Sequence, residues 1–247
     1  MEKIISSFII LIISLIIFSL LLTLAIQSPT TVEIIKTQKV VLTNYSFPTV
    51  YLKIPAVDSE GNGVVTKLKV EAKPGEGRTL VNIDQLLFWI DTQHSIRLAK
   101  KVAENVTGID LSNIDLFYAI ETNASVIEGP SAGAAITIAT IALIENKTIN
   151  ESVMITGTIN SDGSIGPVGE VAAKAKAAKD VGATLFLVPL GQAVQTYYEP
   201  KQVCQKFGFI TYCTVEYKPR KVNVGEEVGI EVKEVSNIRE ALSYFFS

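Results

Sequence analysis

The feature that most restricts the fold is an uninterrupted run of almost wholly apolar residues from Ala134 to Ile144. The run is long enough for a buried helix but too short to cross a bilayer, which takes about 20 residues. Gly129 and Pro130 break the chain just before it, so Ser131 is expected at or near the N-terminus of the helix. Helix N-termini carry unpaired N–H groups and a positive dipole, which can stabilise an oxyanion. Ser131 is therefore a candidate nucleophile, although serine is also a common N-cap residue.

A second apolar segment runs from Ile4 to Ile26 and is interrupted only by Ser and Thr. It is long enough for a transmembrane helix and exceeds the roughly 7–15 apolar residues of a cleaved secretory signal. We favour an uncleaved anchor at 1–27, with a cleaved signal as the alternative, followed by a tether and first strand at 28–48. Lys3 precedes the segment and Glu33 is the first charge after it, which mildly favours an exterior body.

Two further patterns favour an exterior location at the cell membrane. The chain contains more N-x-[ST] sequons than its composition leads one to expect, although chance remains an alternative. They begin at Asn44, Asn105, Asn123, Asn146 and Asn150. Cys204 and Cys213 lie close together in a stretch rich in Tyr, Phe and Thr, which predicts a hairpin or a long loop. The two cysteines can form a disulfide in an oxidising compartment and would be thiols in a reducing one.

Composition excludes several function classes. The net charge of −3 and the pI of about 5.4 give no basic footprint for nucleic acid. One His and two Cys do not support structural zinc, so no metal is expected. The sequence contains no G-x-x-x-x-G-K-[ST] phosphate loop, so neither ATP nor another cofactor is expected.

Periodicity predicts a mixed α/β (α+β) fold. Strands are expected at 50–54, 64–72, 114–120, 153–159, 186–188 and 228–232, and helices at 84–105, 134–144, 168–181 and 238–246. His94 falls within the first helix, where a surface or capping position is expected.

The base that would serve Ser131 is constrained by chain order. Gly129–Gly133 matches the G-x-S-x-G nucleophile elbow, which needs its His after the serine, whereas His94 comes before it. In the chymotrypsin-like order the histidine precedes the serine, so His94 could be the base. That fold is all-β, however, whereas this chain is predicted to alternate helices and strands. A lysine base is therefore expected.

Helical spacing singles out one lysine. Lys176, Lys179 and Asp180 share a polar face, whereas Lys174 lies among Val171, Ala178 and Val181. Burial of an amine lowers its pKa, so Lys174 can be neutral near pH 7 and can act as a general base. The alternative is a lysine that extends its amine to solvent from the edge of an apolar face.

Two blocks resemble the Lon protease family. Glu128-Gly-Pro-Ser131-Ala-Gly133 is similar to its D-G-P-S-A-G. Thr156-Gly157, with Gly163, Gly166–Gly169 and Lys174, resembles its second block. The resemblance covers about 49–247, with an inserted Cys-containing segment near 191–224. It implies a ribosomal protein S5 domain 2-like fold, in which Ser131 is the nucleophile and Lys174 is its base. By the same resemblance Thr156 orients the lysine, and Glu128, Gly129 and Ala132 support the serine.

Three departures from the family pattern stand out. Glu128 replaces Asp, Thr158 replaces the usual Glu, and the second of two consecutive glycines is Glu170. The family's ATPase has no counterpart in the sequence, and an apolar segment stands in its place. Lon-type domains usually act in rings, so a homo-oligomer is a candidate state.

Together these features predict a membrane-anchored, ATP-independent serine endopeptidase with a Ser131–Lys174 dyad. Its expected substrates are unfolded or exposed polypeptides. The alternative is a proteolytically inactive Lon-fold domain that acts as a binding or assembly module at the membrane.

Overall fold

A computed structural model describes residues 14, 15, 17, 48–83, 90–121 and 129–246. The chain divides into two units, Met1–Tyr45 and Ser46–Ser247, and the second contains all the elements discussed below. Most of the predicted anchor, the tether up to residue 47 and Glu128 lie outside the described residues. Within the described part of the chain, no helix combines the length and the apolar character needed to cross a membrane.

The second unit mixes helices and strands, as the periodicity predicts. The helices are α2 (Ile90–Thr107), the 3-10 turn η1 (Pro130–Ala132), α3 (Gly133–Ile144), α4 (Val171–Asp180), α5 (Val224–Val228) and α6 (Ile238–Phe245). The strands are β1 (Thr49–Val57), β2 (Gly63–Pro74), β3 (Thr79–Val81), β4 (Ile114–Glu121), β5 (Val153–Ile155), β6 (Thr158–Ile159), β7 (Ile165–Gly166), β8 (Leu185–Pro189), β9 (Val194–Phe207), β10 (Ile210–Asn223) and β11 (Glu231–Val235).

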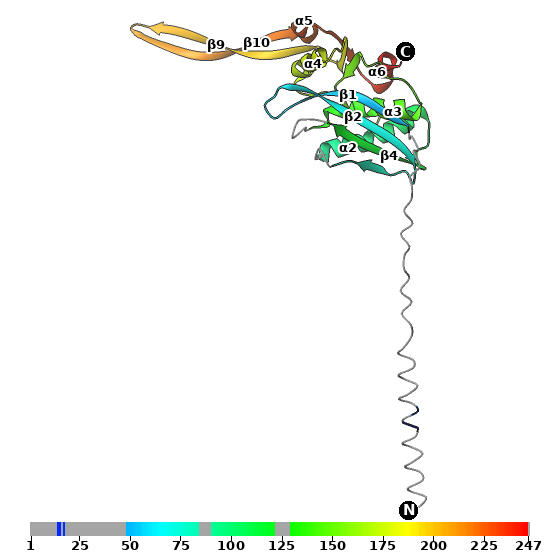
Figure 1. The fold of residues 1–247 in the computed structure, drawn as a ribbon. Coiled ribbons are helices and arrows are strands. Elements are labelled where there is room, and N and C mark those ends of the chain that lie inside the picture. Colours follow the sequence, from blue (N-terminus) through cyan, green and yellow to red (C-terminus); the bar gives the residue numbers. More distant parts are fainter. Residues whose placement is uncertain (1–13, 16, 18–47, 84–89, 122–128, 247) are drawn as a thin grey trace, which may run out of the picture. The chain divides into compact units, whose positions relative to one another are not determined.

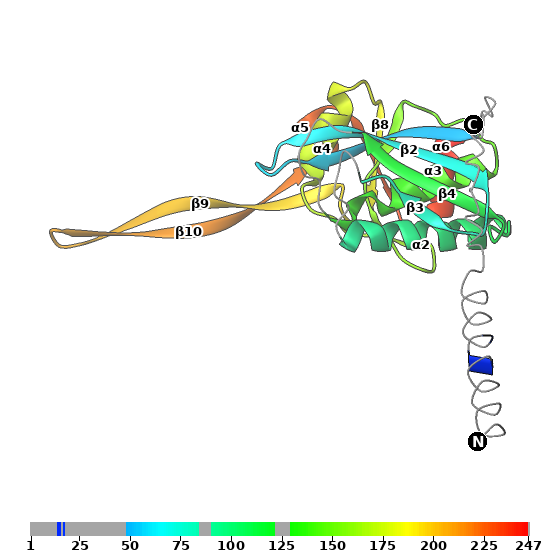
Figure 2. The same cartoon turned by 60° about the horizontal axis from the view of Figure 1, so that its bottom comes forward.

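The larger sheet has the strand order β1-β2-β4-β3, with β1, β2 and β4 labelled in Figure 1 and β3 in Figure 2. The β1–β2 and β2–β4 pairs are antiparallel, and β3 runs parallel to β4. Side chains in β1 alternate, with Leu52 and Ile54 buried and Tyr51 and Lys53 exposed. This alternation gives the sheet one apolar face, and α2 and α3 cover it (Figure 2).

Helix α3 is buried on every side. All residues from Gly133 to Leu143 are buried, which confirms the prediction from the apolar run. Its two polar side chains, Thr137 and Thr140, donate to the carbonyl oxygens of Gly133 and Ile136, each at 2.8 Å. The Thr140 hydroxyl also lies 3.0 Å from the Tyr118 hydroxyl. Buried hydroxyl groups are costly unless they are hydrogen-bonded, and these are satisfied.

A smaller parallel sheet, β11-β8-β5, packs with α4 and α5 around a second apolar cluster that includes Phe186 and Val188. The strand predicted at 228–232 exists but begins three residues later, because α5 ends at Val228 and β11 starts at Glu231. The Asn223 side chain accepts from the N–H groups of Gly225 and Glu226 and caps α5. Gly229, at φ 74°, ends the helix in the left-handed conformation that favours glycine.

The two longest strands, β9 and β10, form a hairpin that pairs with no other described strand. It extends away from the sheets of the second unit in both views (Figures 1 and 2). Cys204 and Cys213 lie opposite each other in the register and are joined by a disulfide. Near the base of the hairpin, Val222 is the one buried residue of the two strands.

Candidate active site

Ser131 lies in the middle of η1, immediately before α3. Gly129, at φ 96°, starts this turn in a conformation that other residues rarely adopt. Gly133 is required for another reason, since a Cβ there would lie 2.8 Å from Ile159 N and Ile159 Cγ2. The N-cap residues of η1 and α3 are Gly129 and Ala132, so Ser131 is not a helix cap.

The backbone of Ser131 is held by the Thr156-Gly157 peptide between β5 and β6. Gly157 N donates to the Ser131 carbonyl at 2.9 Å, and Ala134 N donates to the Gly157 carbonyl at 3.0 Å. The buried Thr156 hydroxyl donates to the same Ser131 carbonyl at 3.4 Å. The structure thus brings together Ser131, Ala132 and Thr156 from the two blocks that the sequence singled out.

Two polar residues of α2, not identified from the sequence, hold the turn from the other side. The Thr92 hydroxyl donates to the Gly129 carbonyl, and the Ser95 hydroxyl lies within hydrogen-bond distance of the Pro130 carbonyl, both at 3.4 Å. Both side chains are buried on the face of α2 that carries Ile96 and Ala99. Their position in an otherwise apolar stripe was the signal that could have revealed them.

Lys174 projects from the buried face of α4 and is only 4% exposed. Its Nζ donates to the Gly169 carbonyl at 3.0 Å. Burial disfavours the charged amine and lowers the pKa of Lys174 to about 8, although the Glu170 carboxylate acts in the opposite direction. Roughly a tenth of the amine is then neutral at pH 7. Lys176 and Lys179 are exposed, so the helical periodicity ranked the three lysines correctly.

Glu170 precedes α4 in a left-handed conformation, with φ 55° and ψ 40°. This is the position of the second glycine in the pattern that the chain resembles. The backbone therefore keeps a glycine-like conformation although a side chain is present, which costs about 1–2 kcal/mol. It also explains why α4 begins at Val171 and not at Val168, where the periodicity had suggested.

The described side chains do not form a closed dyad. No hydrogen bond joins Ser131 to Lys174 within the described residues, since Lys174 donates to Gly169 and Thr156 to the serine carbonyl. Thr156 thus contacts the backbone of the serine and not the lysine that it was expected to orient. Catalytic hydrogen bonds are often long in enzymes without substrate and tighten when substrate binds, so this geometry is compatible with the dyad.

His94 is exposed on α2, and no hydrogen bond joins it to Ser131 within the described residues. The mixed fold also differs from the all-β fold in which a preceding histidine would serve as base. Among the described residues no cluster of His, Cys, Asp and Glu could hold a metal ion.

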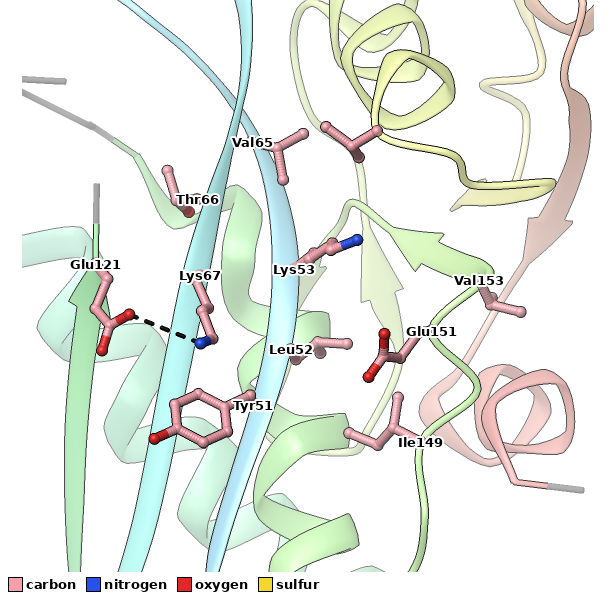
Figure 3. Close-up of a pocket in the computed structure, with 11 residues that line it drawn as sticks. Tyr51, Leu52, Lys53, Val65, Thr66, Lys67, Glu121, Ile149, Glu151 and Val153 are labelled. Atoms are coloured by element: carbon pink, nitrogen blue, oxygen red, sulfur yellow. Dashed lines mark ion pairs between the residues drawn. The ribbon is translucent and has the colours of Figure 1, made fainter. Parts of the chain in front are cut away.

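A groove of about 780 Å³ lies where the β1–β2 ribbon meets the segment that leads into β5 (Figure 3). Its charged residues are Lys53, Lys67, Glu121 and Glu151, and Lys67 forms a 3.9 Å ion pair with Glu121. Neither Ser131 nor Lys174 lines it. The groove is therefore separate from the candidate catalytic residues.

A mixed α/β domain with a serine at the start of a buried helix and a buried lysine on another helix fits the serine hydrolases that use a lysine base. Residues 94–217, half of the chain, match the family model of the Lon protease (S16) C-terminal proteolytic domain. The chain belongs to this family of serine peptidase domains.

Curated relatives agree with the family match. The archaeal Lon protease of Thermoplasma acidophilum is 35% identical over 138 residues, which are 53% of this chain and 20% of that protein. The archaeal Lon protease of Thermococcus kodakarensis is 26% identical over 204 residues, 78% of this chain and 30% of that protein. The Lon protease of Phenylobacterium zucineum is 31% identical over 131 residues, 51% of this chain and 16% of that protein. The chain thus spans less than a third of the length of these relatives.

Proposed function

We propose that this protein is a membrane-anchored serine endopeptidase in which Ser131 is the nucleophile and Lys174 the general base. The observation that carries the proposal is the buried Lys174 amine, whose pKa is lowered to about 8. Structural lysines are usually solvated and charged, whereas a base must be neutral near the working pH. The held conformation of the Ser131 turn and the membership of the family support the same assignment.

In the proposed reaction, the neutral Lys174 Nζ takes the proton from Ser131 Oγ as the oxygen attacks the carbonyl carbon of the peptide. The C–N bond then breaks, and the amine product leaves with that proton. Water then attacks the resulting ester and loses a proton to Lys174; the ester C–O bond breaks, the acid product leaves, and Ser131 Oγ takes the proton back from Lys174. The N–H groups of Gly133 and Ala134 already donate to the carbonyls of Pro130 and Gly157. We therefore assign the adjacent N–H of Ala132 to the developing oxyanion.

The remaining parts of the proposal concern location and substrates. The apolar segment from Ile4 to Ile26 would anchor the chain, with the peptidase domain on the exterior face of the membrane. Three of the sequon asparagines, Asn105, Asn146 and Asn150, are exposed, which supports an exterior location. We further propose that this domain by itself hydrolyses unfolded or exposed polypeptides without ATP.

Covalent labelling tests the chemistry directly. A serine-directed fluorophosphonate should label the intact chain at Ser131, and labelling should be lost in Ser131→Ala and strongly slowed in Lys174→Met. Digestion of unfolded casein without ATP should show the same dependence. A folded protein that neither reacts with the probe nor cleaves casein would instead favour the inactive binding-module alternative.

Proteolysis of whole cells tests the topology. External protease should digest the body from Asn44 onward while the cells remain intact. Protection until lysis would contradict the exterior location without affecting the proposed dyad.

A further inference from the structure

The tip of the β9–β10 hairpin exposes large apolar side chains that no described element covers. Phe207, Phe209 and Ile210 are 68%, 98% and 64% exposed. Gly208, at φ 59°, occupies the first position of the two-residue turn between the strands, and Phe209 follows at the apex. A single exposed apolar residue needs no explanation, but three at one apex indicate a contact surface.

The edges of the hairpin are unsuited to pairing with a further strand. Pro200 lies within β9 and Pro219 within β10, and neither has an N–H to donate to a neighbouring strand. Lys201 and Lys218 lie beside them, and charged edges also oppose strand addition. We therefore expect the hairpin to bind a partner through the side chains at its apex, and not by backbone hydrogen bonds to an added strand.

Polarity rises from the apex to the base. Residues 202–215 include no acidic side chain and one charged residue, Lys206. Acidic residues begin with Glu216, which at about 3.3 Å per residue lies roughly 20 Å along the strand from the apex. Nearer the base, opposite charges face each other across the strands, as in Lys201–Glu216 and Glu199–Lys218.

This gradient matches the layers of a membrane surface. Phe and Ile suit the boundary of the acyl chains, whereas Tyr and Lys suit the headgroup layer, and Tyr212 and Lys206 lie just behind the apex. Residues 194–223 carry five basic and two acidic side chains, although the whole chain has a net charge of −3. The hairpin is thus a basic projection on an acidic protein and complements anionic lipid.

The depth of such a contact is limited by the backbone. The outer edges of β9 and β10 carry N–H and C=O groups without partners on a further described strand. Unpaired backbone groups are too costly in the hydrocarbon core, so the hairpin cannot span it. An interfacial contact leaves those groups hydrated while the apical side chains reach the acyl boundary.

We propose that the apex Phe207–Ile210, together with Lys206, binds the interfacial layer of an anionic lipid bilayer. The hairpin would then give the peptidase domain a second attachment to the membrane besides the N-terminal segment. The proposed lipid contact adds to the proposed membrane location and does not depend on the peptidase chemistry.

Tryptophan quenching in vesicles tests the contact. The full chain carrying Trp89→Phe and Phe209→Trp is mixed with vesicles of phosphatidylcholine and phosphatidylglycerol whose acyl chains are brominated. The new tryptophan at position 209 should be quenched at least about twofold more than one placed near the base by Tyr198→Trp. Omitting phosphatidylglycerol, or adding Lys206→Gln, should weaken the quenching.

The outcomes separate this proposal from the anchor. Protein that floats with vesicles while position 209 stays unquenched keeps the anchor and overturns the hairpin contact. A shielded but unquenched tryptophan would mean that a protein covers the apex, which also overturns it. If the N-terminal segment does not anchor, position 209 should still be quenched by added vesicles. Flotation should then be lost when Phe207, Phe209 and Ile210 are all changed to Ser.

Discussion

Helix α3 and the β9–β10 hairpin are both rich in apolar side chains, yet they differ completely in burial. Every residue of α3 from Gly133 to Leu143 is buried, whereas the large side chains of the hairpin, such as Phe209 and Tyr217, are mainly exposed. The helix has the four-stranded sheet, α2 and α6 around it, whereas the hairpin beyond its base has only its own two strands among the described elements. Apolar content therefore predicts burial only where other elements are available to cover it.

The Ser131 turn and the hairpin apex also differ in how their residues are held in place. At the start of α3, Ser131 is held by hydrogen bonds from Thr156 and Gly157 within a packed core. At the hairpin apex a turn and a nearby disulfide fix the strands, but the apical side chains are exposed and no other described element covers them. We expect chemistry at the first place and adaptable surface contact at the second.

The largest expected effect concerns catalysis at the edge of α3. Ser131→Ala and Lys174→Met should each lower casein hydrolysis by about 10²–10⁴-fold or more, because one removes the nucleophile and the other the base. The double variant should be no worse than either, since the two groups act as a unit. Rates at fixed casein concentration measure this, with circular dichroism to verify folding.

Matched controls come from the same helix and from the hairpin. Lys176→Met removes an exposed amine two residues away and should leave the rate nearly unchanged. Phe209→Ser should also leave hydrolysis of a short soluble peptide unchanged. Full activity of folded Lys174→Met, or loss of activity in His94→Ala, would contradict the dyad.

The next effect is on stability and tests the comparison directly. Ile138→Ala, at a site that is 0% exposed, should destabilise the fold by about 2–5 kcal/mol, because it leaves a cavity in the core. Phe209→Ala removes an even larger side chain but should change stability by less than about 0.5 kcal/mol. Urea unfolding measures both. Similar losses would mean that the hairpin apex packs against the protein in solution.

Much of the fold was predictable because local patterns carried it. The apolar run predicted α3, alternation predicted β1 and β2, and a short apolar stretch predicted β4. The spacing of the lysines on one helix identified Lys174 as the buried one, because neighbours along a helix determine its apolar face. These predictions needed no knowledge of distant residues.

Contacts between distant residues were not predictable in the same way. Asp115 in β4 accepts from Arg78 Nε at 2.9 Å and from the N–H groups of Glu76 and Arg78, so it holds the turn after β2. The Arg78 side chain and these backbone donors lower the pKa of Asp115 to about 2. Thr92 and Ser95 likewise have roles only because α2 packs against the Ser131 turn. Hydrogen bonds between residues this far apart in the sequence leave no periodic pattern from which they could be predicted.

A third prediction concerns the cost of keeping Lys174 buried. Below pH 8 the folded protein holds a proton on a buried amine, whereas the unfolded chain holds it in water. Lys174→Met should therefore stabilise the fold near pH 7 by about 2 kcal/mol, after allowing for the lost hydrogen bond to Gly169. Because the folded pKa is lowered, wild-type stability recovers as pH rises from about 8 to the unfolded value of about 10.4. The advantage of the variant should shrink over this range and become a small deficit near its upper end, because the hydrogen bond to Gly169 is still missing.

Urea midpoints at several pH values measure this difference. Lys176→Met is the control, since its exposed amine should give no such pH dependence. A Lys174→Met variant that is less stable than wild type at neutral pH would show that the amine is a structural hydrogen-bond donor and not a strained base.

The smallest expected effect comes from removing the disulfide. This change tests whether the hairpin can loosen without altering the stability or the activity of the rest of the domain. Cys204 and Cys213 join residues that already face each other, and the loop they close lies wholly within the hairpin. Changing both to Ser should raise amide hydrogen exchange in β9 and β10, because an isolated two-stranded hairpin is marginally stable. Exchange in α3, the urea midpoint and peptide hydrolysis should stay within error, since Val222 is the one buried residue of the two strands. A loss of activity on reduction would instead mean that the hairpin helps to position the Ser131 turn, and the separation of the two regions would fail.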